Sequence, residues 1–142
     1  MRSPHKSALA VFAAVCFLAV AGMSQGKAPD WLRQAAAMPL PSYDKDVHAV
    51  VLHNEEVITV DSSGRLTTTE RRAVRITQKD GKSDAVATAF YLSKFSNVKD
   101  FEAWLIAPGG AVTSFGKKET IDRISDPDDI YDEGRVKIIN AS

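Results

Sequence analysis

The chain has 142 residues, of which 44% are hydrophobic and 25% are charged, a balance typical of one globular domain and not of a disordered chain. Lysine plus arginine and aspartate plus glutamate number 18 each, so the chain is formally neutral. It lacks the strong basic field that nucleic-acid backbones select, and we expect no nucleic-acid partner.

The first 21 residues have the pattern of a secretory signal peptide. Arg2 and Lys6 form a basic start, residues 8–21 are apolar without interruption, and small residues follow. This run is shorter than the ~20 residues that a membrane-spanning helix needs. We expect cleavage after Ala21, with Ser24 as the alternative, and therefore an exported protein in the periplasm or medium with no membrane contact after cleavage. An uncleaved anchor is the competing interpretation.

Cleavage changes both the charge and the chemistry of the mature chain. Without Arg2 and Lys6, 16 basic and 18 acidic residues remain, a net charge of −2. Cys16, the only cysteine, lies inside the apolar run, and the Phe17 and Leu18 that follow it do not fit a lipid-attachment signal. We therefore expect a mature chain without disulfides or a thiol nucleophile, stabilised by core packing.

Residues 22–47 are expected to form a linker and one short helix. Asp30 is placed to cap the helix, the alanine run that follows favours helix, and Pro39 ends it. Trp31 and Ala35 are four residues apart and share a face. Trp31 is interpreted as an anchor that packs the helix on the sheet, with an aromatic ligand platform as the alternative.

The β-rich domain is expected over residues 48–142 and opens with a half-buried hairpin at 49–77, turning at 61–64. Its return strand alternates, as a side-chain period of two requires. Leu66, Val74 and Ile76 would share one face; Thr67, Thr69, Arg71, Arg75 and Thr77 would share the other.

Charged side chains line this hairpin. Depending on the register, Glu55 faces either Glu70 or Arg71, because a slip of one residue changes every cross-strand partner. Exposed pairs of this kind contribute roughly 0.2–1 kcal/mol each. The functional alternative is a basic face, including Arg75, that docks an acidic partner or a following domain.

Further strands are predicted at 85–91, 101–107, 111–115 and 135–139, with a turn at 79–82. Residues 117–124 fit either a short helix or an irregular crossing. The segment around Trp104 is apolar on both faces, which favours a central strand. The predicted fold is mainly β, an antiparallel β-sandwich-like or strongly bent sheet. The last strand stops without a turn or a partner after it, so we expect a domain truncated at its C-terminus.

Candidate binding residues are few. Acidic residues gather at 122–133, but an EF-hand glycine and its last glutamate are missing, so a solvated acidic loop, neutralised by Arg123, Arg135 or Lys137, is expected in place of a calcium site. His48 and His53 would face opposite sides of a regular strand and could not share a metal. We expect no catalytic residue, metal or cofactor. The candidate interaction surface comprises Glu55, Arg71, Arg75, Asp128, Asp129 and Asp132.

Several segments, taken in order, resemble the uncharacterised domain that precedes a transglutaminase-like domain in many exported bacterial proteins. They are the signal peptide, Pro-Asp-Trp-Leu, Ala-Val-Val-Leu-His-Asn-Glu, Asp-Ser-Ser-Gly-Arg, Arg-Arg-Ala-Val-Arg-Ile-Thr and Ala-Trp-Leu-Ile-Ala-Pro-Gly-Gly-Ala-Val. The resemblance covers residues 31–142. It implies a β-rich, non-catalytic module, with chemistry at a Cys-His-Asp site in a downstream domain; no member of that triad can be placed in this chain.

The expected function is therefore that of an accessory or interaction module of a longer transglutaminase-like protein. Its partner would be a downstream domain of the same polypeptide or an envelope protein or peptide. A stand-alone structural or adhesion domain of the cell envelope is one alternative. A small metal-dependent hydrolase is another, although the chain has no G-x-S-x-G nucleophile motif.

Overall fold

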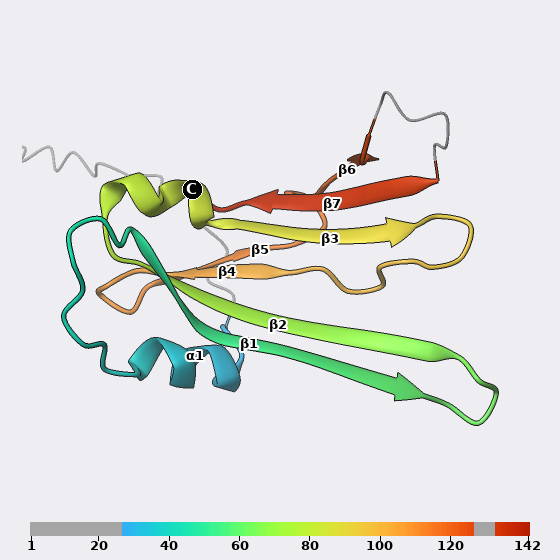
Figure 1. The fold of residues 1–142 in the computed structure, drawn as a ribbon, viewed down its shortest axis with the longest axis horizontal. Helices are drawn as coiled ribbons and strands as arrows, with labels where there is room; N and C mark the ends of the chain where they lie inside the picture. The colour runs from blue at the N-terminus through green and yellow to red at the C-terminus, as the bar shows by residue number, and fades with distance from the viewer. Residues whose placement is uncertain (1–26, 127–132) are drawn as a thin grey trace, which may run out of the picture.

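The computed structural model describes residues 27–126 and 133–142. In chain order the elements are α1 (Asp30–Ala37), β1 (Ala49–Val60), β2 (Leu66–Ile76), the 3-10 helix η1 (Lys79–Asp84), β3 (Val86–Leu92), β4 (Ala103–Ile106), β5 (Val112–Phe115), β6 (Ile121–Ile124) and β7 (Gly134–Asn140). The strands of the described residues form three antiparallel sheets, β1–β2, β3–β7–β6 and β4–β5 (Figure 1). The prediction of a mainly β, antiparallel fold with one short helix near its start is confirmed.

The β1–β2 hairpin is the longest feature and extends well past α1 (Figure 1). The Asp61 carboxylate accepts hydrogen bonds from the amides of Ser63 and Arg65 at 2.8 and 3.0 Å, and Gly64 takes a φ of +80° that favours glycine. The register places Glu55 opposite Arg71, not Glu70, which resolves the alternative that the sequence left open.

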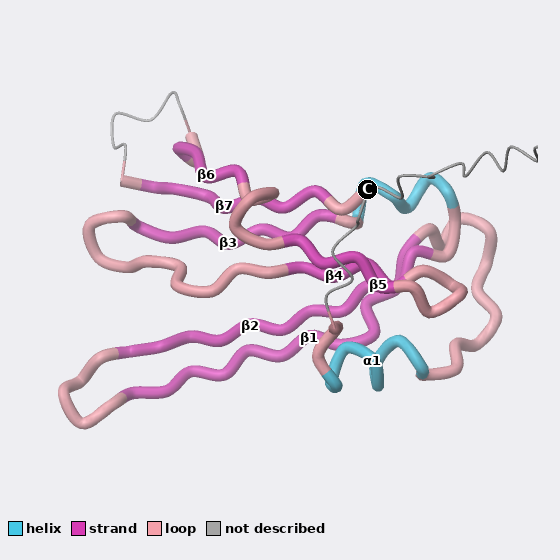
Figure 2. Tube along the Cα trace, turned by 180° about the vertical axis from the view of Figure 1, so that it is seen from behind, coloured by secondary structure: helices cyan, strands magenta, loops and turns pink. Residues whose placement is uncertain are grey.

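Helix α1 lies along the proximal part of this hairpin (Figures 1 and 2). The Trp31 ring lies 5.5 Å from the His53 ring of β1, so the anchor interpretation of Trp31 is confirmed. The Arg75 guanidinium of β2 donates to the Ala36 carbonyl and, at 3.2 Å, to the Met38 carbonyl, both at the C-terminal end of α1, where backbone oxygens lack helical partners. These contacts fix both ends of the helix to the hairpin.

The start of α1 differs from the expectation. Pro29, not Asp30, is the N-cap residue, and no side chain caps the helix. Asp30 is the first helical residue and pairs with Arg33 one turn later, as residues three apart on a helix can. The carboxylate still lies where the positive end of the helix dipole favours it.

The one buried residue of β2 lies on the face that carries two of its arginines. Ala73 is 3% exposed and shares a face with Arg71 and Arg75. On the opposite face, Val74 and Ile76 are half-buried, whereas Leu66 is exposed. Ala73 is buried there because α1 covers the proximal end of that face, and strand alternation alone does not reveal a helix packed from elsewhere.

Strand β7 is the central strand of its sheet, with β3 on one side and β6 on the other. Both partners precede it in the sequence, so the argument that its partner should follow residue 142 was wrong. Residues 117–119 form a turn and 121–124 a strand, so neither a helix nor an irregular crossing describes this segment. Ile139 on β7 has 0% of its surface exposed and is the largest fully buried side chain among the described residues.

The segment around Trp104 is not a central strand. Strand β4 pairs only with β5 among the described residues, Trp104 is half-buried, and Leu105 is exposed. Its apolar composition on both faces is therefore not matched by burial on both faces. A cost of about 3–5 kcal/mol for Trp104→Ala applies to a fully buried ring, which this one is not.

The core of the described residues is small. Ala28, Ala35, Ala73 and Ile139 are the buried hydrophobic residues in this part of the chain. Among the described residues, fourteen larger hydrophobic side chains are exposed, several of them on the distal half of the β1–β2 hairpin. No helix within residues 27–126 and 133–142 has the length and apolar character needed to cross a membrane.

Candidate functional site

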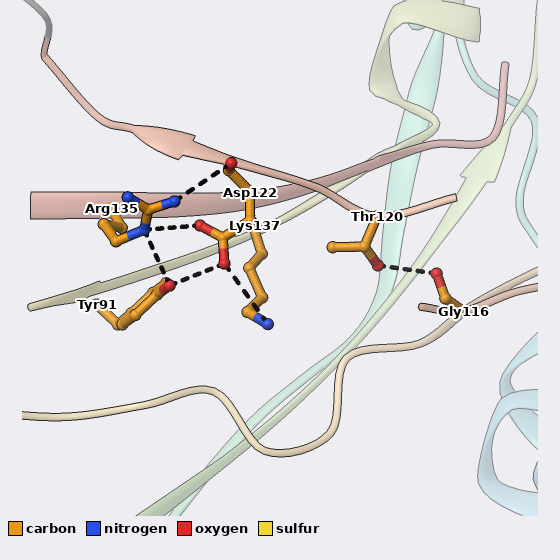
Figure 3. Close-up of polar contacts among 6 residues, drawn as sticks. All are labelled: Tyr91, Gly116, Thr120, Asp122, Arg135 and Lys137. Carbon is orange, nitrogen blue, oxygen red and sulfur yellow. Dashed lines mark hydrogen bonds and ion pairs between the residues drawn. The ribbon is translucent and has the colours of Figure 1, made fainter. Parts of the chain in front are cut away.

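The register of the β3–β7–β6 sheet brings four polar side chains together. Arg135 and Lys137 lie on the central strand β7, two residues apart and on one face. Tyr91 of β3 is opposite Arg135, and Asp122 of β6 is opposite Lys137. The Arg135 side chain reaches Asp122 diagonally across the strand pair, as long side chains can. These residues form what we call the Asp122 cluster (Figure 3).

The Asp122 carboxylate is the centre of this cluster. One oxygen accepts from the Tyr91 hydroxyl at 2.8 Å, and the other accepts from Arg135 Nε at 2.9 Å. Lys137 Nζ lies 3.7 Å from the first oxygen, and Arg135 Nε also donates to the Tyr91 hydroxyl oxygen at 3.2 Å. Arg135 Nη2 adds a bond of 3.4 Å to the Asp122 carbonyl (Figure 3). One acidic group is thus matched by two cations.

These contacts favour the charged forms. The hydrogen bond from Tyr91, followed by the hydrogen bond and charge of Arg135 and the charge of Lys137, lowers the pKa of Asp122 from its usual 3.8, although partial desolvation opposes the shift. The hydrogen bonds to Tyr91 and Asp122 raise the pKa of Arg135. An aspartate kept charged in this way orients its neighbours and is poorly suited to act as a general acid near neutral pH.

A depression of about 400 Å³ opens beside the Asp122 cluster. Two of the residues that line it, Asp122 and Lys137, belong to the cluster. The others come from two connecting segments, Lys99 and Phe101 between β3 and β4, and Lys117 and Thr120 between β5 and β6. Its volume falls within the range of small-molecule sites. We call this feature the lysine depression.

A second, smaller depression of about 250 Å³ lies between α1 and β1 and is lined by Trp31, Gln34, Ala35, Met38 and His53. His53 Nε2 is buried and has no hydrogen-bond partner among the described residues, since Glu55 Oε2 is 3.9 Å away. Glu55 instead pairs with Arg71 at 3.0 Å. This depression marks the boundary between the helix and the hairpin.

The structure places the predicted interaction residues in different settings. Arg71 and Glu55 form the exposed cross-strand pair that the sequence suggested. Arg75 is engaged with carbonyl oxygens at the end of α1 and is not part of an open basic face. Asp128, Asp129 and Asp132 lie outside the described residues.

Metal binding finds no support in the described part of the chain. Within residues 27–126 and 133–142, no three side chains of histidine, cysteine, aspartate or glutamate come together to hold a metal ion. His48 precedes β1, and the strand is not regular, because a bulge at Leu52 shifts the register between Val51 and His53. The argument that His48 and His53 face opposite sides assumed one regular strand, and that assumption was wrong.

The sequence named part of the Asp122 cluster. Arg135 and Lys137 were proposed to neutralise the acidic segment, and both contact Asp122. Tyr91 was missed because it meets Asp122 and Arg135 only through the pairing of β3 and β6 with β7. The depression residues outside the cluster, Lys99, Phe101, Lys117 and Thr120, were missed because they lie in connecting segments far apart in the sequence. The predicted strand at 85–91 includes Tyr91, but the sequence did not indicate its partner strand.

The fold and these sites define a small, mainly β, antiparallel module with a cation-rich depression at the edge of one sheet. Residues 62–141, more than half of the chain, match the family described as Domain of Unknown Function with solved-structure structure (DUF3857). The chain belongs to this family, which agrees with the expected uncharacterised domain. No curated protein and no solved structure matches the chain significantly.

Proposed function

We propose that this chain is a non-catalytic, exported interaction module that packs against a later domain of the same polypeptide, a transglutaminase-like domain that carries the chemistry. Membership of an uncharacterised domain family supports the module interpretation. The apolar segment 8–21, which lies outside the described residues, supports export. The order of sequence segments supports the transglutaminase-like association.

The observation that carries this proposal is the apolar tip of the β1–β2 hairpin, formed by Ile58, Val60 and Leu66. These side chains are 57%, 64% and 61% exposed. Val60 is opposite Leu66, and Ile58 lies two residues before Val60, so the three share a face. An exposed group of large aliphatic side chains is typical of a surface that is covered by a partner.

The same hairpin has few stabilising contacts of its own at its distal end. Residues 56–72 are exposed along both strands, and a two-stranded ribbon is at best marginally stable in water. Glu56 and Glu70 are directly opposite each other, and like charges in this arrangement are destabilising. A partner surface that is apolar beside the tip and basic beside these glutamates would bury the exposed aliphatic side chains and offset the repulsion between the two carboxylates.

Site-specific photo-crosslinking in the native, full-length protein tests the proposal. A photoreactive residue at Ile58 would crosslink to a segment of the same polypeptide that follows residue 142, identified by mass spectrometry. The matched control is Thr59, which is adjacent and exposed but lies on the opposite face. Equal crosslinking at both positions, or an intact mass showing that the native chain stops at Ser142, would overturn it.

The native protein should be isolated from the envelope fraction, since the intact mass then also tests export. A mature chain that begins near Gly22 supports cleavage of the signal peptide. Crosslinks from Ile58 to a second copy of the chain or to a separate envelope protein would replace the proposed arrangement with a stand-alone structural or adhesion role.

A further inference from the structure

The lysine depression concentrates positive charge in a chain that is formally neutral. Lys99, Lys117 and Lys137 line it together with a single acidic residue, Asp122, which gives +3 − 1 = +2 for the lining. Asp100 and Glu102, which flank Phe101 in the sequence, do not line the depression. Within the lining itself, lysines therefore outnumber acidic residues three to one.

Asp122 is shared between Arg135 and Lys137 and so cannot neutralise all three lysines. Its carboxylate is already matched by Arg135, which lies outside the lining and bonds to it at 2.9 Å. Lys137 Nζ is farther away, at 3.7 Å, and keeps donors for another acceptor. Counting Arg135 with the lining residues raises the local charge to +4 − 1 = +3.

The other two ammonium groups are open to a ligand. Lys99 and Lys117 are exposed, and neither forms an ion pair with any residue of the described chain. The nearby Glu119 carboxylate is occupied by the Gly116 amide at 2.8 Å, and the Thr120 hydroxyl donates to the Gly116 carbonyl at 2.8 Å (Figure 3). These two bonds fix the turn that carries Lys117.

The lining also specifies the shape of a ligand. Three flexible ammonium groups act as point charges that suit an oxyanion and provide no acceptor for a cation. Phe101 adds an aromatic wall, and its edge or face can pack on an apolar group joined to the anion. A volume of about 400 Å³ admits a molecule of this size.

We propose that the lysine depression binds a small ligand in which a carboxylate or phosphate is attached to an apolar group, with Lys99, Lys117 and Lys137 holding the oxyanion and Phe101 packing on the apolar part. This site is independent of the hairpin tip and of the domain order. It is a binding site and requires no reaction.

Titration of the full-length protein by calorimetry and by amide NMR shifts tests this proposal. The probes are benzoate and phenyl phosphate, which place either oxyanion on a ring, with inorganic phosphate and neutral benzyl alcohol for comparison. Saturable binding of one ring-bearing anion, with shifts clustered at residues 99–101, 117–120 and 137, is expected. Which probe binds more tightly assigns the natural ligand to the carboxylate or the phosphate class.

The variants make the test specific to these lysines. Lys99→Gln with Lys117→Gln should weaken binding about tenfold or more, as the loss of charge-assisted hydrogen bonds requires. Lys118→Gln, an exposed neighbour outside the lining, should change it less than about twofold. Both altered lysines are exposed, so the variants should retain the native circular dichroism spectrum.

The salt dependence of binding is an independent test. Raising the ionic strength from about 0.02 to 0.3 M should weaken anion binding at this exposed site. The proposal is wrong if benzyl alcohol binds as well as the anions. It is equally wrong if the double variant and Lys118→Gln bind alike, or if no probe saturates by about 20 mM. None of these outcomes bears on crosslinking from Ile58.

Discussion

The substitution Ile139→Ala tests whether β7 is the centre of the folded module. Ile139 is the largest fully buried side chain among the described residues, with 0% exposure, and β7 is paired on both edges. Alanine removes three carbon atoms, and at about 0.8 kcal/mol per buried CH₂ the loss of burial costs about 2.4 kcal/mol. The cavity left behind adds to this cost, within an observed range of about 2–5 kcal/mol.

Urea unfolding followed by circular dichroism measures this cost. With a denaturant dependence of about 1–3 kcal/mol per molar, a loss of about 2.4 kcal/mol lowers the urea midpoint by roughly 0.8–2.4 M. Because a small module is only marginally stable, the alanine variant can be too unstable to measure, and Ile139→Val, expected to cost about 0.5–1.5 kcal/mol, then replaces it.

Ile121→Ala is the matched control, since it makes the same chemical change on β6 of the same sheet. Ile121 is 59% exposed, so the remaining 41% of its burial is worth about 1 kcal/mol at most. If the two alanine variants unfold at the same urea concentration, Ile139 is not the packing centre and the placement of β7 is wrong.

Two further predictions concern a close contact and an acid-sensitive contact. Gly81→Ala should lower the urea midpoint sharply because the added Cβ would overlap the His48 carbonyl oxygen. Gly109 has open space around it, so Gly109→Ala should leave the midpoint unchanged. Equal midpoints for the two variants would contradict the close contact between Gly81 and His48. The pKa of Asp122 is lowered from its usual 3.8 in the folded protein, so its charged carboxylate stabilises the fold at pH values above 3.8. This stabilisation is lost as the pH falls through the folded-state pKa. Asp122→Asn should therefore lose less stability than the parent between pH 6 and pH 3 in urea titrations, and an equal loss would show that its contacts do not form.

The parts of the fold that were predictable depend on local chemistry. The hairpin turn follows from an aspartate that bonds its own backbone two and four residues on, and from a glycine at positive φ. The two strands that it joins carry β-branched residues, so their pairing needed no distant information. The short helix was predictable from its alanine run and the proline beyond it.

The parts that were missed depend on pairing between distant segments. Tyr91 and Arg135 are 44 residues apart, and no local pattern indicates that β7 lies between β3 and β6. Likewise, Trp104 lies in a segment that looks central, yet its strand has only one partner among the described residues. Composition reports how apolar a strand is, whereas burial depends on which elements pack against it.

The two proposed surfaces also differ in the forces that act on them, and this makes them separable. The hairpin tip is aliphatic, so its association should strengthen with apolar area and depend little on salt. The lysine depression lies on other strands and loops and should weaken as salt is added. Because the two sites share no residue and belong to different sheets, substitutions at one should leave the other unchanged within about 0.5 kcal/mol. A larger coupling would mean that ligand binding at the lysines changes how the hairpin meets its partner, and the module would then transmit a signal and not only hold two domains together.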